Sequence, residues 1–197
     1  MPRYLTTHEH RYSRMVNTTS TEPLLQAVAL ALVDQPRASL QELAKAIGVS
    51  KATLYRFCPT RELLLQRLYD ESVCQFGHAT TQAQLETGSF RESFRLLVEG
   101  HMKHKELFVF LIYNWRPELL EPNNPQSAWL EIQRKIDNFF LRGQKEGLLR
   151  VDISATAMSE MFMGMLLSLV DAERMGRVAR ADVVSNLEAL FFDGAKV

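Results

Sequence analysis

The amino-acid sequence predicts an all-α fold of about nine helices. Apolar residues recur at intervals of three and four along most of the chain, which is the helical period, and alternating strand-like patterns are nearly absent. The chain has 197 residues, of which 46% are hydrophobic. It is therefore long enough to bury a core and too apolar to be a wholly disordered chain.

The N-terminal segment, residues 1–20, lacks helical periodicity and is expected to form a flexible arm rich in Thr, Ser, Arg and His. A first helix follows. Pro23 lies in its first turn, where a missing N–H costs little, and the helix is expected to end near Pro36. Its apolar face comprises Leu24, Val28, Ala31 and Leu32.

Capping residues predict where the next helices begin. Ser39 followed by Glu42 is a capping box, in which each side chain satisfies a backbone N–H at the start of a helix. Thr60 can cap a helix that continues to about Thr87 and is roughly 40 Å long. A helix of that length is able to connect two domains.

A second capping box, Ser89 with Glu92, is expected at the start of the following helix. The spacing of apolar residues then predicts the remaining helices, and two prolines delimit a loop. The expected helices lie at about 90–101, 107–115, 129–143, 154–175 and 181–192, and the loop lies at 117–125.

The charge of the chain is distributed unevenly. There are 23 basic and 23 acidic residues, so the formal net charge is zero. Residues 1–70 nevertheless carry +3 and residues 71–197 carry −3. A basic patch on the early segment is therefore available to a polyanion such as nucleic acid. Its basic residues are Arg37, Lys45, Lys51, Arg56, Arg61 and Arg67.

Several classes of protein are excluded by what the sequence lacks. Two cysteines are too few for a disulfide framework or a thiolate zinc site, which favours the cytoplasm. The longest apolar run, Met161 to Val170, is too short to span a bilayer, so no membrane partner is expected. His101 and His104 have a spacing compatible with metal ligation, but no third ligand completes a set, and we expect no metal and no cofactor. Phosphate-binding and hydrolase motifs are absent, so no catalytic residue is assigned.

Residues 40–59, LQELAKAIGVSKATLYRFCP, satisfy the steric demands of a helix-turn-helix. Ala44 is small where two helices cross, and Gly48 lies where the turn needs a left-handed backbone. A small shared core is expected from Leu43, Ile47, Val49, Leu54 and Phe57.

The stretch GVSKATLYRFCPTRELLL resembles the signature of TetR-type transcriptional regulators (the TetR/AcrR family). The specific resemblance covers roughly residues 24–65, and the rest of the chain matches in length, helix count and apolar pattern. Two departures are Cys58, where the family usually has phenylalanine, and a turn from Asp34 to Ser39 that is one residue short and has no glycine. The resemblance implies a helix-turn-helix DNA-binding domain of three helices at 21–66 and an effector-binding and dimerisation domain at 67–197.

The resemblance implies a homodimer in which residues 50–57 of each subunit enter successive major grooves of a double-stranded DNA operator. Arg56 can bind a guanine edge or, almost equally well, a phosphate, and Tyr55 resembles the family's phosphate-contacting tyrosine. For Ser39 and Thr60, helix capping is the plain alternative to a phosphate contact. The candidate DNA-binding residues are Ser39, Ser50, Lys51, Ala52, Thr53, Tyr55, Arg56, Thr60 and Arg61.

A supply of aromatic residues in the middle of the chain suits a pocket for a small hydrophobic or aromatic effector of unknown identity, which the resemblance also implies. The alternative is that most of these residues belong to the core. The candidates for effector binding are Phe94, His101, Phe108, Tyr113, Trp115 and Trp129.

The helix expected at 154–175 has two faces that can pack, one of them a stripe of small or flexible residues. We expect a second subunit on that stripe, the alternative being a central helix of a monomer. The candidates for the dimer interface are Met161, Gly164, Ser168, Val184, Leu187 and Phe191.

The sequence thus predicts a ligand-responsive, DNA-binding transcriptional regulator, a repressor that its effector releases from the operator. Two alternatives stay open. One is a redox-responsive regulator that uses Cys58 and Cys74, and the other is a helical enzyme.

Overall fold

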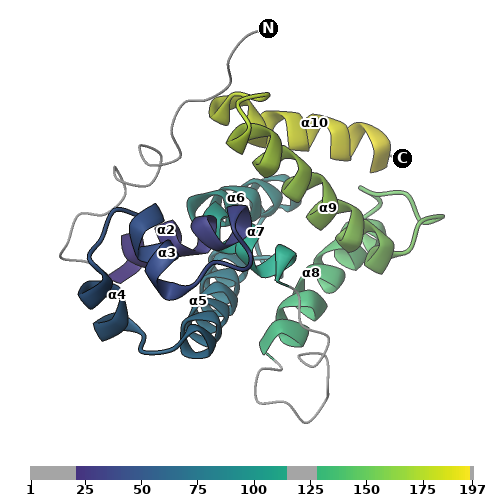
Figure 1. The fold of residues 1–197 in the computed structure, drawn as a ribbon. Helices are drawn as coiled ribbons and strands as arrows, with labels where there is room; N and C mark the ends of the chain where they lie inside the picture. Colours follow the sequence, from purple (N-terminus) through teal and green to yellow (C-terminus); the bar gives the residue numbers. More distant parts are fainter. Residues whose placement is uncertain (1–20, 115–127, 196–197) are drawn as a thin grey trace, which may run out of the picture.

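The computed structural model describes residues 21–114 and 128–195, which are all-α, as predicted (Figure 1). The expected arm at 1–20 and the expected loop at 117–125 lie outside the described residues, as does Trp115. Within the described part there are nine α-helices, one 3₁₀ turn and no strand. The elements are α2 (Thr21–Asp34), α3 (Leu40–Ala46), α4 (Lys51–Phe57), α5 (Arg61–Gln82), α6 (Phe90–Lys103), α7 (Lys105–Tyr113), α8 (Ala128–Lys145), α9 (Ala155–Arg174), η2 (Arg180–Asp182) and α10 (Val183–Ala195).

Two hydrophobic clusters organise these helices. The first, called the head, gathers the apolar residues of α2, α3, α4 and the start of α5, together with Leu107 and Phe110 of α7. The second, called the body, lies among α5 to α10 and is rich in phenylalanine. Because α7 supplies two side chains to the core of the head, the head and the body share a packed boundary rather than a linker.

Helix α5 joins the head to the body. Thr60 caps it, because its hydroxyl oxygen accepts a hydrogen bond from the N–H of Leu63 at 3.2 Å. The helix ends at Gln82 and not at the expected Thr87, so its 22 residues span about 33 Å. Gln84 adopts a φ of +51° in the turn that follows. The Ser93 hydroxyl donates to the carbonyl oxygen of Gln84 at 3.1 Å, which fixes this turn against α6.

The predicted capping box at Ser89 is wrong. Ser89 precedes α6 with extended backbone, but its side chain makes no capping hydrogen bond. The Ser93 hydroxyl, one turn later, is used instead to hold the preceding turn. Ser89 and Glu92 have the spacing of a capping box, but the hydrogen bond in this region is made by Ser93 to the preceding turn.

Helix α9 is the one helix within the described ranges that is long and apolar enough to cross a membrane, judged by length and composition. Its Met158, Phe162, Leu166 and Val170 are buried in the core of the body. Packing of α9 against α8 and α10 accounts for this stripe. A core helix of a folded domain passes the same test of length and composition.

Candidate nucleic-acid interface and effector cavity

The helix-turn-helix forms as the sequence predicts. Gly48, at the turn between α3 and α4, has a φ of +73°, a left-handed backbone that favours glycine. The N–H of Val49 donates to the carbonyl oxygen of Ala44 at 3.0 Å and closes the turn. Leu43, Ile47 and Leu54 are fully buried between the helices. The turn and the core together fix the direction in which α4 presents its outer face.

The outer face of α4 is polar and accessible. Ser50 caps the helix, because its hydroxyl oxygen accepts a hydrogen bond from the N–H of Thr53 at 3.0 Å. Lys51, Tyr55 and Arg56 are exposed. The Nζ atom of Lys51 lies 5.2 Å from the centre of the Tyr55 ring, so the cation and the aromatic ring form one edge of this face. Side chains of this kind contact phosphates and base edges.

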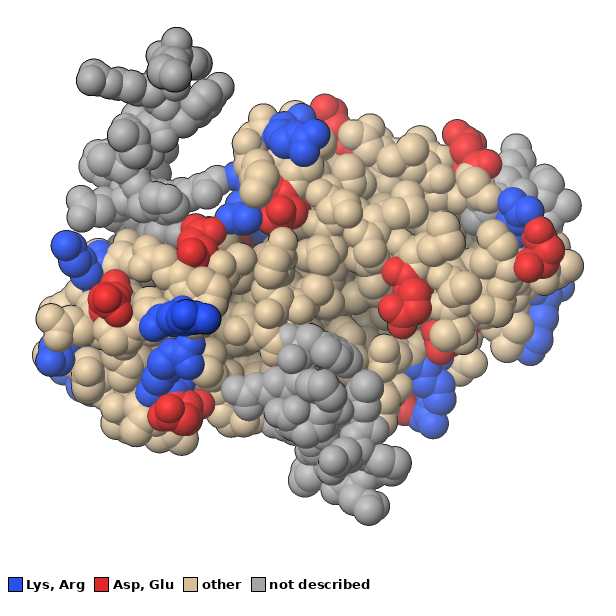
Figure 2. Space-filling view, turned by 45° about the vertical axis from the view of Figure 1, so that its right-hand side comes forward, with Lys and Arg blue, Asp and Glu red and all other residues tan. Residues whose placement is uncertain are grey.

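The remaining basic residues of the head surround this face. Figure 2 shows Lys and Arg side chains at the end of the molecule where Figure 1 places α3, α4 and the start of α5, beside a wide uncharged surface of the body. The exposed cations of the head are Arg37, Lys45, Lys51, Arg56 and Arg67.

Ser39 and Glu42 form the predicted capping box at the start of α3. The N–H of Ser39 donates to Glu42 Oε2 at 2.8 Å, and the Ser39 hydroxyl donates to the same oxygen at 2.7 Å. These hydrogen bonds hold the pKa of Glu42 below its ordinary value. Both donors of Ser39 are therefore engaged within the chain, which favours the capping role over a phosphate contact.

Arg61 braces the turn that the sequence marks as unusual. Its Nη2 donates to the carbonyl oxygen of Pro36 at 2.6 Å, and its Nε donates to that of Ala38 at 3.3 Å. An arginine of α5 thus holds the short turn between α2 and α3 in place through two hydrogen bonds to its backbone.

We expect Arg61→Ala to lower the free energy of unfolding by about 1 kcal/mol, because the half-buried contact to Ala38 and the exposed contact to Pro36 both lose a charged donor. Urea unfolding measures this change. Arg56→Ala, which removes an exposed arginine from the same domain, should change stability by less than about 0.5 kcal/mol. If Arg61 contacts a phosphate as well, its loss should also reduce the salt dependence of DNA binding by about one charge. Unchanged stability would contradict the role as a brace.

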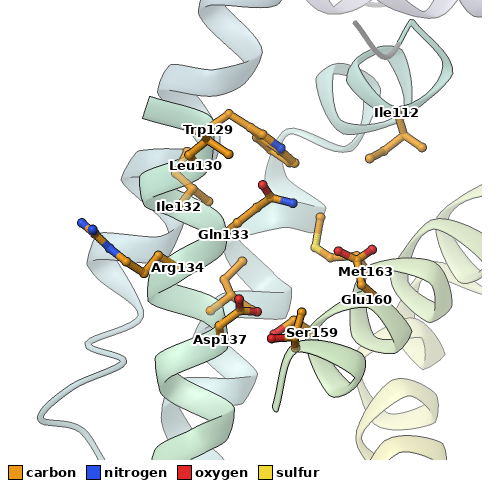
Figure 3. A pocket seen from close by; sticks show the side chains of 12 residues that line it. Ile112, Trp129, Leu130, Ile132, Gln133, Arg134, Asp137, Ser159, Glu160 and Met163 are labelled. Atoms are coloured by element: carbon orange, nitrogen blue, oxygen red, sulfur yellow. The ribbon is translucent and has the colours of Figure 1, made fainter. Parts of the chain in front are cut away.

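A cavity of about 610 Å³ lies in the body between α8 and α9, with Ile112 of α7 on one side (Figure 3). This volume suits a drug-sized ligand. Its walls combine apolar and polar side chains. The lining residues are Ile112, Trp129, Leu130, Ile132, Gln133, Arg134, Ile136, Asp137, Thr156, Ser159, Glu160 and Met163.

Among the effector candidates that the structure describes, Trp129 is the one that lines this cavity. Its ring centre lies 5.6 Å from that of Phe76, which in turn contacts His101 at 4.4 Å and Phe108 at 5.2 Å. His101 and Phe108 are therefore core residues behind Trp129, with 2% and 0% of their surfaces exposed.

The other effector candidates lie elsewhere. Phe94 packs in a separate cluster with Phe162, Phe191 and Phe192. Tyr113 is 57% exposed and does not line the cavity. For Phe94 the alternative given above, that most of the aromatic residues belong to the core, fits the structure better. The exposed Tyr113 fits neither interpretation.

The polar cavity residues that were not predicted from the sequence are spaced regularly along α8 and α9. Gln133 and Asp137 are one and two helical turns beyond Trp129, on the same side of α8. Thr156 and Glu160 repeat this spacing on α9. Polar residues thus recur at intervals of four beside an apolar face on each helix, but this pattern does not indicate that the two faces meet.

The expected interface residues differ in their exposure. Met161, Gly164 and Ser168 lie exposed on α9, along a shallow groove that Leu190 of α10 also lines. Leu187 and Phe191, by contrast, are buried in the body's own core. The remaining candidate is Val184, which is half-buried. Leu190, 61% exposed, is the outward residue of α10 that the sequence analysis did not select.

The two cysteines cannot bridge within one chain. Cys58 is buried at the end of α4, and burial raises the pKa of its thiol. Cys74 is exposed thirteen residues into α5, about 20 Å along the helix from its start. A disulfide needs Cα atoms within about 7 Å. Among the described residues there is also no group of three or more His, Cys, Asp or Glu that could hold a metal ion.

No profile of a known protein family matches the chain. It is 42% identical over 174 residues to the HTH-type transcriptional regulator NfxB of Pseudomonas aeruginosa, which covers 88% of this chain and 93% of that protein. It is also 30% identical over 90 residues to the HTH-type transcriptional repressor LfrR of Mycolicibacterium smegmatis, covering 46% of this chain and 48% of that protein.

Solved structures share the fold. The TetR-like regulator LfrR from Mycobacterium smegmatis, in complex with proflavine, has a TM-score of 0.65 at 22% identity and covers 88% of this chain and 94% of its own. Apo AibR has a TM-score of 0.66 at 18% identity and covers 86% of this chain and 96% of its own. Together with the helix-turn-helix and its exposed polar face, these likenesses show that the chain belongs to the TetR family and is a DNA-binding transcriptional regulator, not an enzyme.

Proposed function

We propose that this protein is a cytoplasmic repressor that binds a double-stranded operator as a homodimer and is released by a small hydrophobic or aromatic effector. The outer face of α4 reads the major groove through Lys51, Ala52, Thr53 and Arg56. Two such helices separated by one turn of DNA, about 34–36 Å, contact two half-sites. Tyr55 and the exposed cations around α4 hold the backbone phosphates.

The open face of α9 and α10 is the proposed contact with the second subunit. A Cβ atom added to Gly164 would meet nothing within 4 Å. Met161 and Leu190 are 54% and 61% exposed beside it. Exposed apolar side chains next to a small residue suit the close approach of another helix pair.

The cavity between α8 and α9 is the proposed effector site. Trp129 and the isoleucines of α8 give it an aromatic and apolar wall. LfrR, a structural relative, has been solved in complex with proflavine, an aromatic compound. That complex supports an aromatic effector for this chain, within the same fold.

The observation that carries a ligand-responsive function is the reach of α9 from the cavity to the head. Ser159, Glu160 and Met163 line the cavity in the first half of the helix. In its last turn, Arg174 Nη1 lies 2.6 Å from Asp34 Oδ1 at the end of α2. Glu173, beside Arg174, pairs with Lys105 of α7. A ligand that changes the spacing of α8 and α9 therefore acts on helices that hold the head.

This proposal can be tested without knowing the natural effector. Met163→Cys in a Cys74→Ser background allows N-phenylmaleimide to place an aromatic ring in the cavity, while the buried Cys58 stays unmodified. We expect the labelled dimer to bind an operator, selected from random duplexes, at least about fivefold more weakly than the unlabelled dimer. The same label on Thr87→Cys, at an exposed turn, is the control and should have no effect.

Equal operator affinity before and after cavity labelling would contradict the proposal, provided that mass spectrometry shows complete labelling and that the dimer persists. The Cys74→Ser parent also tests the redox alternative. We expect oxidant to leave its operator affinity and that of the unmodified protein unchanged.

A further inference from the structure

The cavity between α8 and α9 is lined by two carboxylates that form no ion pair within the part of the chain that the structure describes. Asp137 lies on α8 and Glu160 on α9, so they approach the cavity from its two walls (Figure 3). Neither side chain takes part in an ion pair among the described residues. Each carboxylate is thus free to pair with a ligand.

Among the described lining residues there is one cation, Arg134, and it does not offset them. Arg134 pairs with Glu131 one turn earlier on the outer side of α8, and its side chain is 69% exposed. In Figure 3 its guanidinium points away from the side chains of Gln133, Glu160 and Met163. The charge that faces the cavity is therefore negative.

The walls around these carboxylates are largely apolar. Trp129, Ile132 and Ile136 lie on α8, and Ile112 and Met163 lie on the other sides. Asp137 is half-buried and Glu160 is exposed at the rim. A neutral apolar ligand that covered this surface would strip water from Asp137 and give nothing in return, which is unfavourable. A positive charge on the ligand compensates for that loss.

We infer that the effector of this regulator is a lipophilic organic cation, selected by Asp137 and Glu160. The inference rests on the proposed function, since it assigns the chemical class of ligand for the same cavity. It adds two specificity-determining residues, one on each of the helices whose spacing the ligand sets.

The test uses two probes of equal size and opposite charge, tetraphenylphosphonium and tetraphenylborate, with the neutral triphenylphosphine oxide as a third. Calorimetric titration of the full-length dimer measures affinity. We expect the cation to bind at least about tenfold more tightly than the anion and to release the operator. Asp137→Asn and Glu160→Gln should each weaken binding of the cation about three- to tenfold and leave the neutral probe within about twofold.

Glu99→Gln is the matched control, because it removes an exposed carboxylate of α6 that does not line the cavity. Its affinity for the cation should stay within about twofold of wild type. Equal binding of cation and anion, absence of cation binding, or losses that are the same for the charged and neutral probes would overturn the inference. A further outcome separates this inference from the proposed function. If the neutral probe binds and releases the operator, and the two carboxylate variants bind the cation as wild type does, the proposed function is supported and the cationic class of effector is contradicted.

Discussion

Ala52→Glu is expected to weaken operator binding by at least about a hundredfold while leaving the fold intact. Ala52 lies exposed on the outer face of α4, one residue after Lys51 and three before Tyr55. A glutamate at this position places a negative charge and a longer side chain between α4 and the DNA. It repels the phosphates and blocks the approach of the helix to the base edges.

The measurement is fluorescence anisotropy with labelled operator over a range of salt concentrations. Circular dichroism and urea unfolding should stay near wild type, because an exposed helical position tolerates glutamate. Thr87→Glu adds the same charge at an exposed turn of the body and should cost less than about threefold in affinity. If Ala52→Glu binds as Thr87→Glu does, α4 is not the helix that enters the groove.

The head could be predicted from the sequence because its determinants are local. Gly48 marks the turn, Ser39 with Glu42 and Thr60 mark helix starts, and each needs only neighbours within a few residues. Arg61 was different. Its bonds to Pro36 and Ala38 join residues 23 to 25 positions apart, and nothing in the spacing of the sequence indicates them.

The cavity could not be predicted from the aromatic residues of the sequence, because most of them are buried in the core and do not line it. Phenylalanine gains most by leaving water, so Phe94 and Phe108 lie in the core and are fully buried. The cavity instead lies between faces of α8 and α9 that carry both apolar and polar side chains. Asp137 and Glu160 meet there only through packing of two helices, which a single sequence does not specify.

The end of α5 illustrates the same limit at a smaller scale. The sequence between Gln82 and Gly88 contains no proline or glycine, so nothing marks the end of the helix at Gln82. The turn that follows has a left-handed backbone at Gln84, and the Ser93 hydroxyl of α6 donates to the Gln84 carbonyl oxygen. A contact between two helices thus holds the turn, and such a contact is not visible in the local sequence.

His101 is expected to make the body labile to acid. It is 2% exposed, its ring lies 4.4 Å from that of Phe76, and its Nδ1 lies 2.6 Å from the carbonyl oxygen of Leu97. Burial lowers the pKa of His101 from 6.5 to about 4, against a smaller opposing effect of the Leu97 carbonyl and with a small contribution from His104. The folded protein therefore requires the neutral imidazole.

Between pH 6.5 and about pH 4 the unfolded chain binds a proton at this residue and the folded chain does not, so stability rises with pH in that window. The stabilisation is complete above pH 6.5 and falls by about 3 kcal/mol as the pH drops to about 4. Urea unfolding at fixed protein concentration across this window measures the loss, and His101→Leu should remove most of it. His78→Gln replaces an exposed histidine of α5 and should leave the pH profile unchanged. A profile for His101→Leu as steep as that of wild type would mean that another group, such as the partly buried His104, controls the acid response.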